Sequence, residues 1–348
     1  MNFLTALLFP FSVLYDLGTR FRNHLYNIGY KRSFEFEANI IAVGNLSVGG
    51  TGKSPMIEYL VRLLKDQYRI ATLSRGYGRK THGFRLASDQ DDATTLGDEP
   101  FQFYRKFNPT IDVAVGEERA LAIPFLLAEG KGTEVILLDD AYQHRTVKPG
   151  LNILLTSYNK PFYTDHILPM GRLRESRQGA RRADIIIMTK CPGDMPGPEM
   201  ARIKQRIRTY NDKAPIFFTA VRYADPAPVF DLKGISRKLF LFTGIANPSD
   251  LKKYLSGHYH LVGEKTFPDH HRYTARDLQS ILKMAHGENQ EDISLVTTEK
   301  DMVKLLGKEL ESVLKDKPVF FIPIETYFLK DGRQFDALIL KSVKSYSN

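Results

Sequence analysis

Residues 39–54, which read NIIAVGNLSVGGTGKS, constrain the fold more than any other part of the chain. The apolar run at 40–43 predicts a buried strand, and Gly-Lys-Ser after a glycine-rich turn predicts the start of a helix. This layout is typical of a P-loop, where backbone N–H groups and the positive end of a helix surround nucleotide phosphates. An ordinary glycine-rich corner between a strand and a helix is the alternative.

The turn residues have expected parts in phosphate binding. We expect Lys53 to reach the β- and γ-phosphates and the Ser54 hydroxyl to be a Mg²⁺ ligand. Ser47 stands where the pattern G-x-x-x-x-G-K-[ST] has its first glycine. The predicted nucleotide-binding residues are Ser47, Val48, Gly49, Gly50, Thr51, Gly52, Lys53 and Ser54.

The composition suits a globular protein with one large domain or two. The chain has 348 residues, of which 43% are hydrophobic and 26% charged. Its one cysteine, Cys191, excludes an intramolecular disulfide and suits a reducing cytoplasm. The net charge of +9 favours an anionic partner, but it does not choose between nucleic acid, anionic lipid and a phosphorylated substrate.

The N-terminal 33 residues combine an apolar stripe with basic flanks. Residues 3–15 are strongly apolar, but they are too short to span a bilayer, Pro10 interrupts them, and no basic segment of a signal peptide precedes them. After Pro10, apolar residues recur at helical spacing: Leu14, Leu17, Phe21, Leu25 and Ile28. The pattern predicts a helix in a membrane interface or one packed on the protein's own core. We favour the membrane because of the amount of apolar surface.

Alternating strand-like and helical runs predict an α/β fold with parallel strands. The first half has expected strands at 40–43, 69–73, 112–115, 134–138, 152–155 and 184–188, and helices at 53–66, 98–107 and 117–129. After a proline-rich boundary at 225–228, expected strands are 238–242, 260–264, 294–298 and 319–323, with helices at 248–255, 275–286 and 300–306.

The predicted architecture is a P-loop NTPase-like α/β/α sandwich with a second, smaller α/β domain. The expected parts are an amphipathic membrane-associated helix at 1–33, a P-loop core at 34–224, a smaller domain with linker strands at 225–330, and a segment at 331–348 that packs back on the core. Ligands of such folds bind at the carboxyl ends of strands, which is where the motifs of this chain lie.

Two acidic motifs could serve phosphate chemistry. Asp139 and Asp140 end an apolar strand, in the manner of a Walker B motif, and would approach a Mg²⁺ ion held by Ser54. His144 follows closely and could contact the same site, although a lone histidine is often structural. Asp98, in Gly-Asp-Glu-Pro at a helix start, could be the general base for a substrate hydroxyl, or it could simply complement the helix dipole.

Arginines and histidines in compact motifs are further candidates. Arginine suits phosphate oxygens through paired donors, although each could equally be a solvated surface residue. These arginines are Arg75, Arg119, Arg172 and Arg174. In residues 267–274, FPDHHRYT, adjacent histidines are not expected to share a metal. Asp269 or His270 could instead orient a catalytic carboxylate across a cleft between domains.

The ordered set SVGGTGKSP, SRGYG, GDEP, DDAYQHR, LPMGRLRE, GIANP, FPDHHRYT and TEKDMVKL resembles the tetraacyldisaccharide 4'-kinase family, the lipid A 4'-kinases of Gram-negative bacteria. The resemblance implies ATP and Mg²⁺ as cofactors. It implies transfer of the γ-phosphate to the 4'-hydroxyl of a tetraacyldisaccharide 1-phosphate at the cytoplasmic face of the inner membrane. It also implies two α/β/α domains joined by a two-stranded linker.

The same resemblance implies roles for individual residues. Asp98 matches the residue that activates the hydroxyl, and His270 matches its histidine partner. Asp139 and Asp140 match the acidic pair near Mg²⁺. Ser47 is the usual form in the family, whereas Ala141-Tyr142 replaces the more frequent Gly-Phe. The residues expected near substrate or phosphate groups are Arg75, Arg119, His144 and Arg174.

Two other classes of protein are alternatives. Thr189-Lys190-Cys191-Pro192 faintly resembles the guanine-reading Asn-Lys-x-Asp of a GTPase switch or metallochaperone, but it lacks both the Asn and the Asp. Only the positive charge suggests a nucleic-acid ATPase, and no basic–aromatic module accompanies it. We therefore expect a lipid A disaccharide precursor and an anionic inner-membrane surface as partners, no nucleic acid, and a peripheral monomer.

Overall fold

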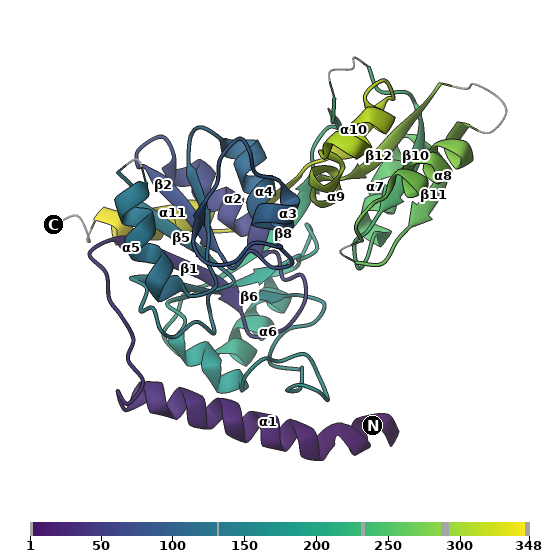
Figure 1. Ribbon diagram of the computed structural model, residues 1–348. Coiled ribbons are helices and arrows are strands. Elements are labelled where there is room, and N and C mark those ends of the chain that lie inside the picture. Colours follow the sequence, from purple (N-terminus) through teal and green to yellow (C-terminus); the bar gives the residue numbers. More distant parts are fainter. Residues whose placement is uncertain (1–2, 131, 231–233, 270, 287–291, 345–348) are drawn as a thin grey trace.

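The computed structural model describes residues 3–130, 132–230, 234–269, 271–286 and 292–344. Within these ranges the strands form one sheet of nine and one of five. Figure 1 shows the two sheets in separate bodies, with helix α1 (Phe3–Asn27) along the lower side of the larger body. The predicted α/β class is confirmed.

The larger sheet has the order β14-β8-β7-β6-β1-β5-β2-β4-β3. Its inner strands pair in parallel, and the edge strands β3 and β14 run antiparallel. The bounds are β1 Asn39–Asn45, β2 Ile70–Ser74, β3 Arg85–Leu86, β4 Asp112–Val115, β5 Val135–Asp139, β6 Leu151–Ser157, β7 Ile185–Thr189, β8 Ile216–Tyr223 and β14 Ile324–Phe328. The strands predicted for the first half are confirmed, whereas β3, β8 and β14 were not predicted.

Helices cover both faces of this sheet, because buried strands with aliphatic side chains on both sides need two apolar covers. Their bounds are α2 Lys53–Leu64, α3 Ala93–Leu96, α4 Asp98–Phe107, α5 Arg119–Glu129, α6 Gly197–Arg208, the 3₁₀ helix η1 Arg177–Arg182 and α11 Gly332–Lys344. Residues of α2, α4 and α11 share one apolar cluster with the sheet, and residues of α5 share another on different strand positions.

The smaller sheet has the order β11-β10-β12-β13-β9 and is parallel except for β9. Its elements are β9 Ala227–Pro228, β10 Lys238–Thr243, α7 Ser249–His258, β11 His260–Thr266, α8 Ala275–His286, β12 Ile293–Thr298, α9 Glu299–Met302, the 3₁₀ helix η2 Val303–Leu305, α10 Lys308–Leu314 and β13 Val319–Ile322. Two apolar clusters pack on its two faces.

The chain leaves the larger sheet after β8 and returns to it as β14. These two strands pair side by side, with Tyr223 opposite Ile324. The chain then ends in α11, whose Phe335 and Ile339 are buried in the core of the larger body. The residues that follow β13 thus belong structurally to the larger sheet.

Helix α1 runs through Pro10, the residue that interrupts the apolar run of residues 3–15. Proline removes its own N–H from the helical ladder, and the bonds of the other residues can still form. The Ser12 hydroxyl, just beyond, fixes the helix by donating to Ile167 O and accepting from Met170 N, at 3.3 and 2.9 Å. Among the described helices, none combines the length and the apolarity needed to cross a bilayer.

Candidate active site

The P-loop follows β1, and its glycines take backbone angles that other residues avoid. Gly49 and Gly52 have φ of 104° and 84°, in the left-handed region that favours glycine. The Thr51 hydroxyl accepts a hydrogen bond from Asn45 Nδ2 at 2.6 Å, and its carbonyl accepts one from Thr189 Oγ1 at 2.7 Å. The curve of the loop is therefore held by side chains at the ends of β1 and β7.

A second segment supports the start of the P-loop. Leu46 O accepts from Arg174 N at 2.7 Å, and Val48 N donates to Arg172 O at 2.8 Å. Between them, Ser47 forms an antiparallel bridge with Leu173. Such extended backbone does not require glycine, which explains how serine can occupy the first glycine position of the P-loop pattern.

Lys53, Asp140 and Arg174 form a charged cluster beside this loop. Lys53 Nζ lies 3.6 Å from Asp140 Oδ1, and Arg174 Nη1 donates to both carboxylate oxygens of Asp140, at 3.1 and 2.9 Å. Burial alone would raise the pKa of Asp140, but the positive charges of Lys53 and Arg174 outweigh it and lower this pKa. Asp140 is therefore an anion held between two cations.

Asp139 lies at the end of β5, opposite Val43 of β1, and is buried. Burial, reinforced by the negative charge of Glu99, raises its pKa. Its Oδ1 atom is buried and has no hydrogen-bond partner among the described residues. A buried carboxylate oxygen that lacks a hydrogen-bond partner and lies close to a second carboxylate, that of Asp140, is better satisfied by a divalent cation than by apolar neighbours.

The donor set suits Mg²⁺ in particular. The described residues contain no cluster of three or more His, Cys, Asp or Glu side chains. Mg²⁺ is usually held by one or two carboxylates together with substrate phosphates and water, so it does not need such a cluster. Ser54, in the first turn of α2, and the acids Asp139 and Asp140 are the residues that could hold it.

The other predicted phosphate-site residues lie around this acid pair, in different environments. Arg119 is buried and donates to Gly116 O and Asp139 O, at 2.6 and 3.2 Å, and burial lowers its pKa to about 10. His144 is half-buried; burial and the charge of Arg119 lower its pKa to about 4, so this imidazole is neutral at pH 7. Arg75 is exposed, and its charge acts on both of these groups.

Asp98 begins α4 directly after Gly97. Gly97 has φ of 96°, and a Cβ atom there would lie 2.9 Å from Tyr77 O, so this position needs glycine. The loop that follows β2, SRGYG, therefore packs directly on the segment GDEP. Because β2 pairs in parallel with β5, which ends at Asp139, the SRGYG loop and the start of α4 lie at the same edge of the sheet as the acid pair.

The second body of the protein also reaches this region. Lys304 Nζ lies 3.9 Å from Asp98 Oδ2. Arg272 donates to Gly78 O at 2.7 Å, so the FPDHHRYT segment touches the SRGYG loop. Asp269 pairs with Lys300 at 3.9 Å. His270, predicted as the partner of Asp98, lies outside the described residues.

Lys190 and Glu175 also shape this site, although neither was predicted to do so. Lys190 Nζ donates to Gly50 O in the P-loop at 2.8 Å. The buried Glu175 carboxylate accepts from Asn23, Gln143 and Arg182, at 2.8, 3.0 and 2.8 Å. The position of Lys190 after β7, at the carboxyl edge of the sheet, was a usable signal. Glu175 ends the motif LPMGRLRE, but its partners are distant in the sequence, so its contacts could not be predicted.

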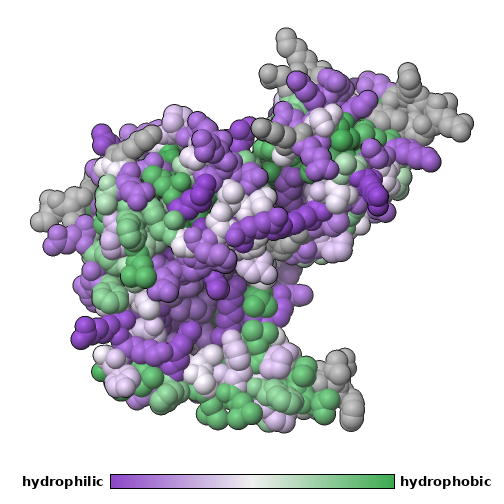
Figure 2. Space-filling model, in the orientation of Figure 1, coloured by the Kyte–Doolittle hydropathy of each residue, from purple (hydrophilic) through white to green (hydrophobic). Residues whose placement is uncertain are grey.

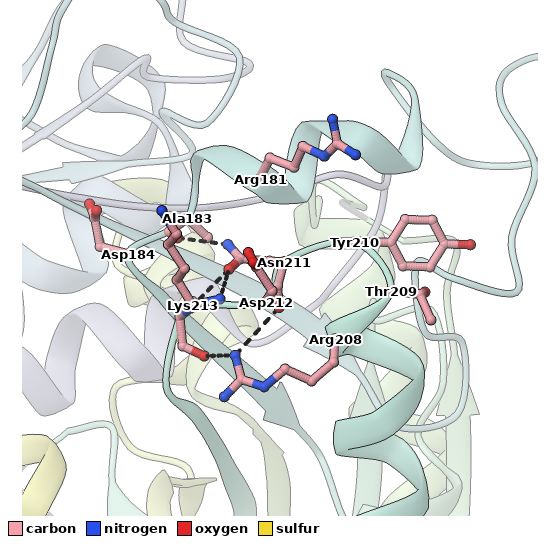
Figure 3. A pocket seen from close by; sticks show the side chains of 10 residues that line it. Arg181, Ala183, Asp184, Arg208, Thr209, Tyr210, Asn211, Asp212 and Lys213 are labelled. Carbon is pink, nitrogen blue, oxygen red and sulfur yellow. Dashed lines mark hydrogen bonds between the residues drawn. The ribbon is translucent and has the colours of Figure 1, made fainter.

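A cavity of about 600 Å³ lies elsewhere, where residues 181–184 meet residues 208–214 (Figure 3). Asp184 directly precedes β7, so this cavity is at the amino end of the strand, opposite the P-loop edge. The Asn211 amide donates to Ala180 O and Ala183 O and accepts from the N–H groups of Lys213 and Ala214. These groups satisfy one another, as in a structural corner.

The fold and the site together define a P-loop protein of the α/β class with a phosphate-binding loop and a Walker-B-like acid pair. Residues 4–344 match the family model described as tetraacyldisaccharide-1-P 4'-kinase. The chain belongs to this family and is a kinase.

Curated relatives and a solved structure extend over nearly the whole chain. The tetraacyldisaccharide 4'-kinase of Flavobacterium johnsoniae is 45% identical over 351 residues, which are 99% of this chain and 98% of that protein. The Parabacteroides distasonis enzyme of the same name is 42% identical, covering 97% of this chain and 94% of that protein. The crystal structure of LpxK from Aquifex aeolicus in complex with ATP is 29% identical with a TM-score of 0.76, and covers 98% and 99% of the two chains.

Proposed function

We propose that this kinase transfers the γ-phosphate of ATP to the 4'-hydroxyl of a tetraacyldisaccharide 1-phosphate, a step of lipid A biosynthesis. The observation that carries the proposal is the convergence of GDEP, the P-loop and the acid pair at one edge of the larger sheet. Asp98 opens α4, whose start packs on the loop after β2, and β2 pairs in parallel with β5, the strand that ends at Asp139. The names of relatives that match over almost their full length support the choice of acceptor.

ATP would bind with its phosphates in the P-loop. The N–H groups of the loop, the start of α2 and Lys53 would counter the phosphate charge. Ser54, Asp139 and Asp140 would hold Mg²⁺, which when bound neutralises charge on the β- and γ-phosphates. The unpartnered Oδ1 atom of Asp139 supports this assignment.

Asp98 would act as the general base. A carboxylate within hydrogen-bond reach of the acceptor hydroxyl takes its proton as the oxygen attacks the γ-phosphorus and the bond to ADP breaks. His270 would orient this carboxylate, a role that rests on the family resemblance. Arg75 and Arg174, on either side of the acid pair, would bind phosphate oxygens of the two substrates.

Helix α1 would place the enzyme on the cytoplasmic face of the inner membrane, as a peripheral monomer without nucleic-acid partners. Its exposed apolar side chains include Leu7, Phe9, Phe11, Leu14, Leu17 and Phe21. Figure 2 shows hydrophobic side chains along the lower edge of the molecule, where α1 lies in Figure 1, with hydrophilic residues above them. Tyr15 OH donates to Arg174 O at 3.2 Å, so the docking helix touches the segment that supports the P-loop.

The test is phosphate transfer from labelled ATP to a tetraacyldisaccharide 1-phosphate by wild type and the Asp98→Asn variant. General bases contribute about 10²- to 10⁴-fold, and a loss of this size with ATP affinity nearly unchanged is expected. Asp66→Asn, at an exposed carboxylate far from the P-loop edge, is the matched control. Wild-type turnover in Asp98→Asn would remove Asp98 from the mechanism, and no transfer by wild type would refute the proposed acceptor.

A further inference from the structure

Two motifs without a role so far, GIANP and TEKDMVKL, meet in the smaller body at one buried ion pair. Asp301 is fully buried, and Lys304 Nζ lies 2.9 Å from its Oδ1 atom. Asp301 Oδ2 accepts from Gly244 N at 2.9 Å and from Thr298 Oγ1 at 2.8 Å. Gly244 belongs to GIANP, and the other residues belong to TEKDMVKL.

A third motif, FPDHHRYT, closes over the same point. A Cβ atom at position 244 would lie 3.1 Å from Asp301 Oδ1, 3.2 Å from His271 Cβ and 3.3 Å from Pro268 O. The packing is therefore tight enough to fix the Asp301 carboxylate in one orientation. Asp301 in turn fixes where the Lys304 ammonium group can lie.

Lys304 points from this pair toward the larger body, where its ammonium lies 3.9 Å from Asp98 Oδ2. Its side chain is almost fully buried, and a buried cation is stable only when carboxylates compensate the lost hydration. Apolar contacts set the alignment: Val303, next to Lys304, packs in one cluster with Leu96 and Phe101, on either side of Asp98. The apolar cluster and the Lys304–Asp98 ion pair therefore join the two bodies at the same place.

We propose that Lys304 is a positioning residue for Asp98, presented by the smaller body through Asp301 and acting across the interface between the two bodies. The proposal rests on the proposed function, because it needs Asp98 to be the general base. An ammonium that restrains one carboxylate oxygen limits rotation of the whole group, and so sets where the carboxylate meets the acceptor hydroxyl. In this proposal, GIANP and TEKDMVKL fix Asp301, and Asp301 holds Lys304 beside Asp98.

The test compares Lys304→Met, Lys304→Arg and Lys106→Met in the full-length enzyme. Lys106 is a matched control, because it also joins the two bodies, through Glu58 and Glu299 at 2.7 and 2.6 Å, without an ion pair to Asp98. Lys304→Met is expected to lower kcat about tenfold or more with KM for ATP within about twofold. Lys304→Arg is expected to recover part of the loss, and Lys106→Met to keep the wild-type kcat.

Lys304→Met leaves Asp301 buried without its cation, so Lys304→Met/Asp301→Asn provides a second variant if the first does not fold. Wild-type kcat in either folded variant would overturn the proposal, as would a loss that Lys106→Met reproduces in full. Asp98→Asn separates the two hypotheses. If Lys304 acts through Asp98, adding Lys304→Met to Asp98→Asn lowers kcat no further. If Asp98→Asn retains wild-type transfer, the general-base assignment itself fails.

Discussion

Replacing Leu14 and Phe21 of α1 by serine tests whether this helix docks on a membrane. The two residues are seven positions apart, on one face of the helix, and are 67% and 65% exposed. Fully burying a leucine or phenylalanine is worth about 1.5–3 kcal/mol, so the exposed two-thirds of each leaves about 1–2 kcal/mol for lipid contact. The pair together would contribute about 2–4 kcal/mol, which corresponds to about a 30- to 700-fold change in partitioning.

The assay is cosedimentation of purified protein with phosphatidylglycerol-containing vesicles. Leu121→Ser/Phe125→Ser on α5 is the matched control, because it removes the same residue types at 61% and 54% exposure from a different face. We expect Leu14→Ser/Phe21→Ser to weaken binding within the range above, and the α5 variant to bind as wild type does. Equal binding by all three proteins, or equal loss in both variants, would refute docking through α1.

Two further predictions concern folding and the single thiol. In Gly44→Ala, the new Cβ atom would lie 2.7 Å from both Cβ and N of Tyr142. We therefore expect a loss of about 1–3 kcal/mol in the free energy of unfolding by urea. The control Gly18→Ala, where the new Cβ atom would have nothing within 4 Å, should cause no loss. An unchanged urea midpoint in Gly44→Ala would contradict the packing. Burial raises the pKa of Cys191 to about 12, so the thiol stays protonated at pH 8 and should resist a disulfide reagent until urea unfolds the protein. Rapid labelling of the native protein would show that the thiol is accessible.

The central strands and the P-loop were predictable because their signals are local. A run of apolar residues is the expected signal of a parallel strand buried on both faces, although β8, which also has such a run, was not predicted. β14 has no fully buried residue, and α6 buries only Ile203 and Ile207, so neither gives a strong periodic pattern. Edge strands and surface helices of this kind depend on tertiary contacts that the sequence does not display.

The candidate site likewise contains residues that the sequence could predict and residues that it could not. The glycines, Lys53 and the acid pair were recognisable because phosphate chemistry demands those residue types at fixed spacing. The roles of Glu175 and Lys304 depend on partners brought together by folding. The buried state of Arg119 was also invisible, since a sequence does not distinguish a solvated arginine from one that donates to backbone carbonyls.

The pairing of β8 with β14 gives the smaller body an unusual status in the chain. Because Tyr223 and Ile324 are register partners in an antiparallel pair, everything between them occupies the position of a hairpin turn. The smaller body is thus an insertion in a β-hairpin of the larger body, and such turns tolerate large insertions. The larger body contains the whole P-loop, the acid pair and Asp98. The smaller body contributes Lys304, and the 3.9 Å approach of Lys304 to Asp98 depends on the two chain crossings at the turn end of that hairpin.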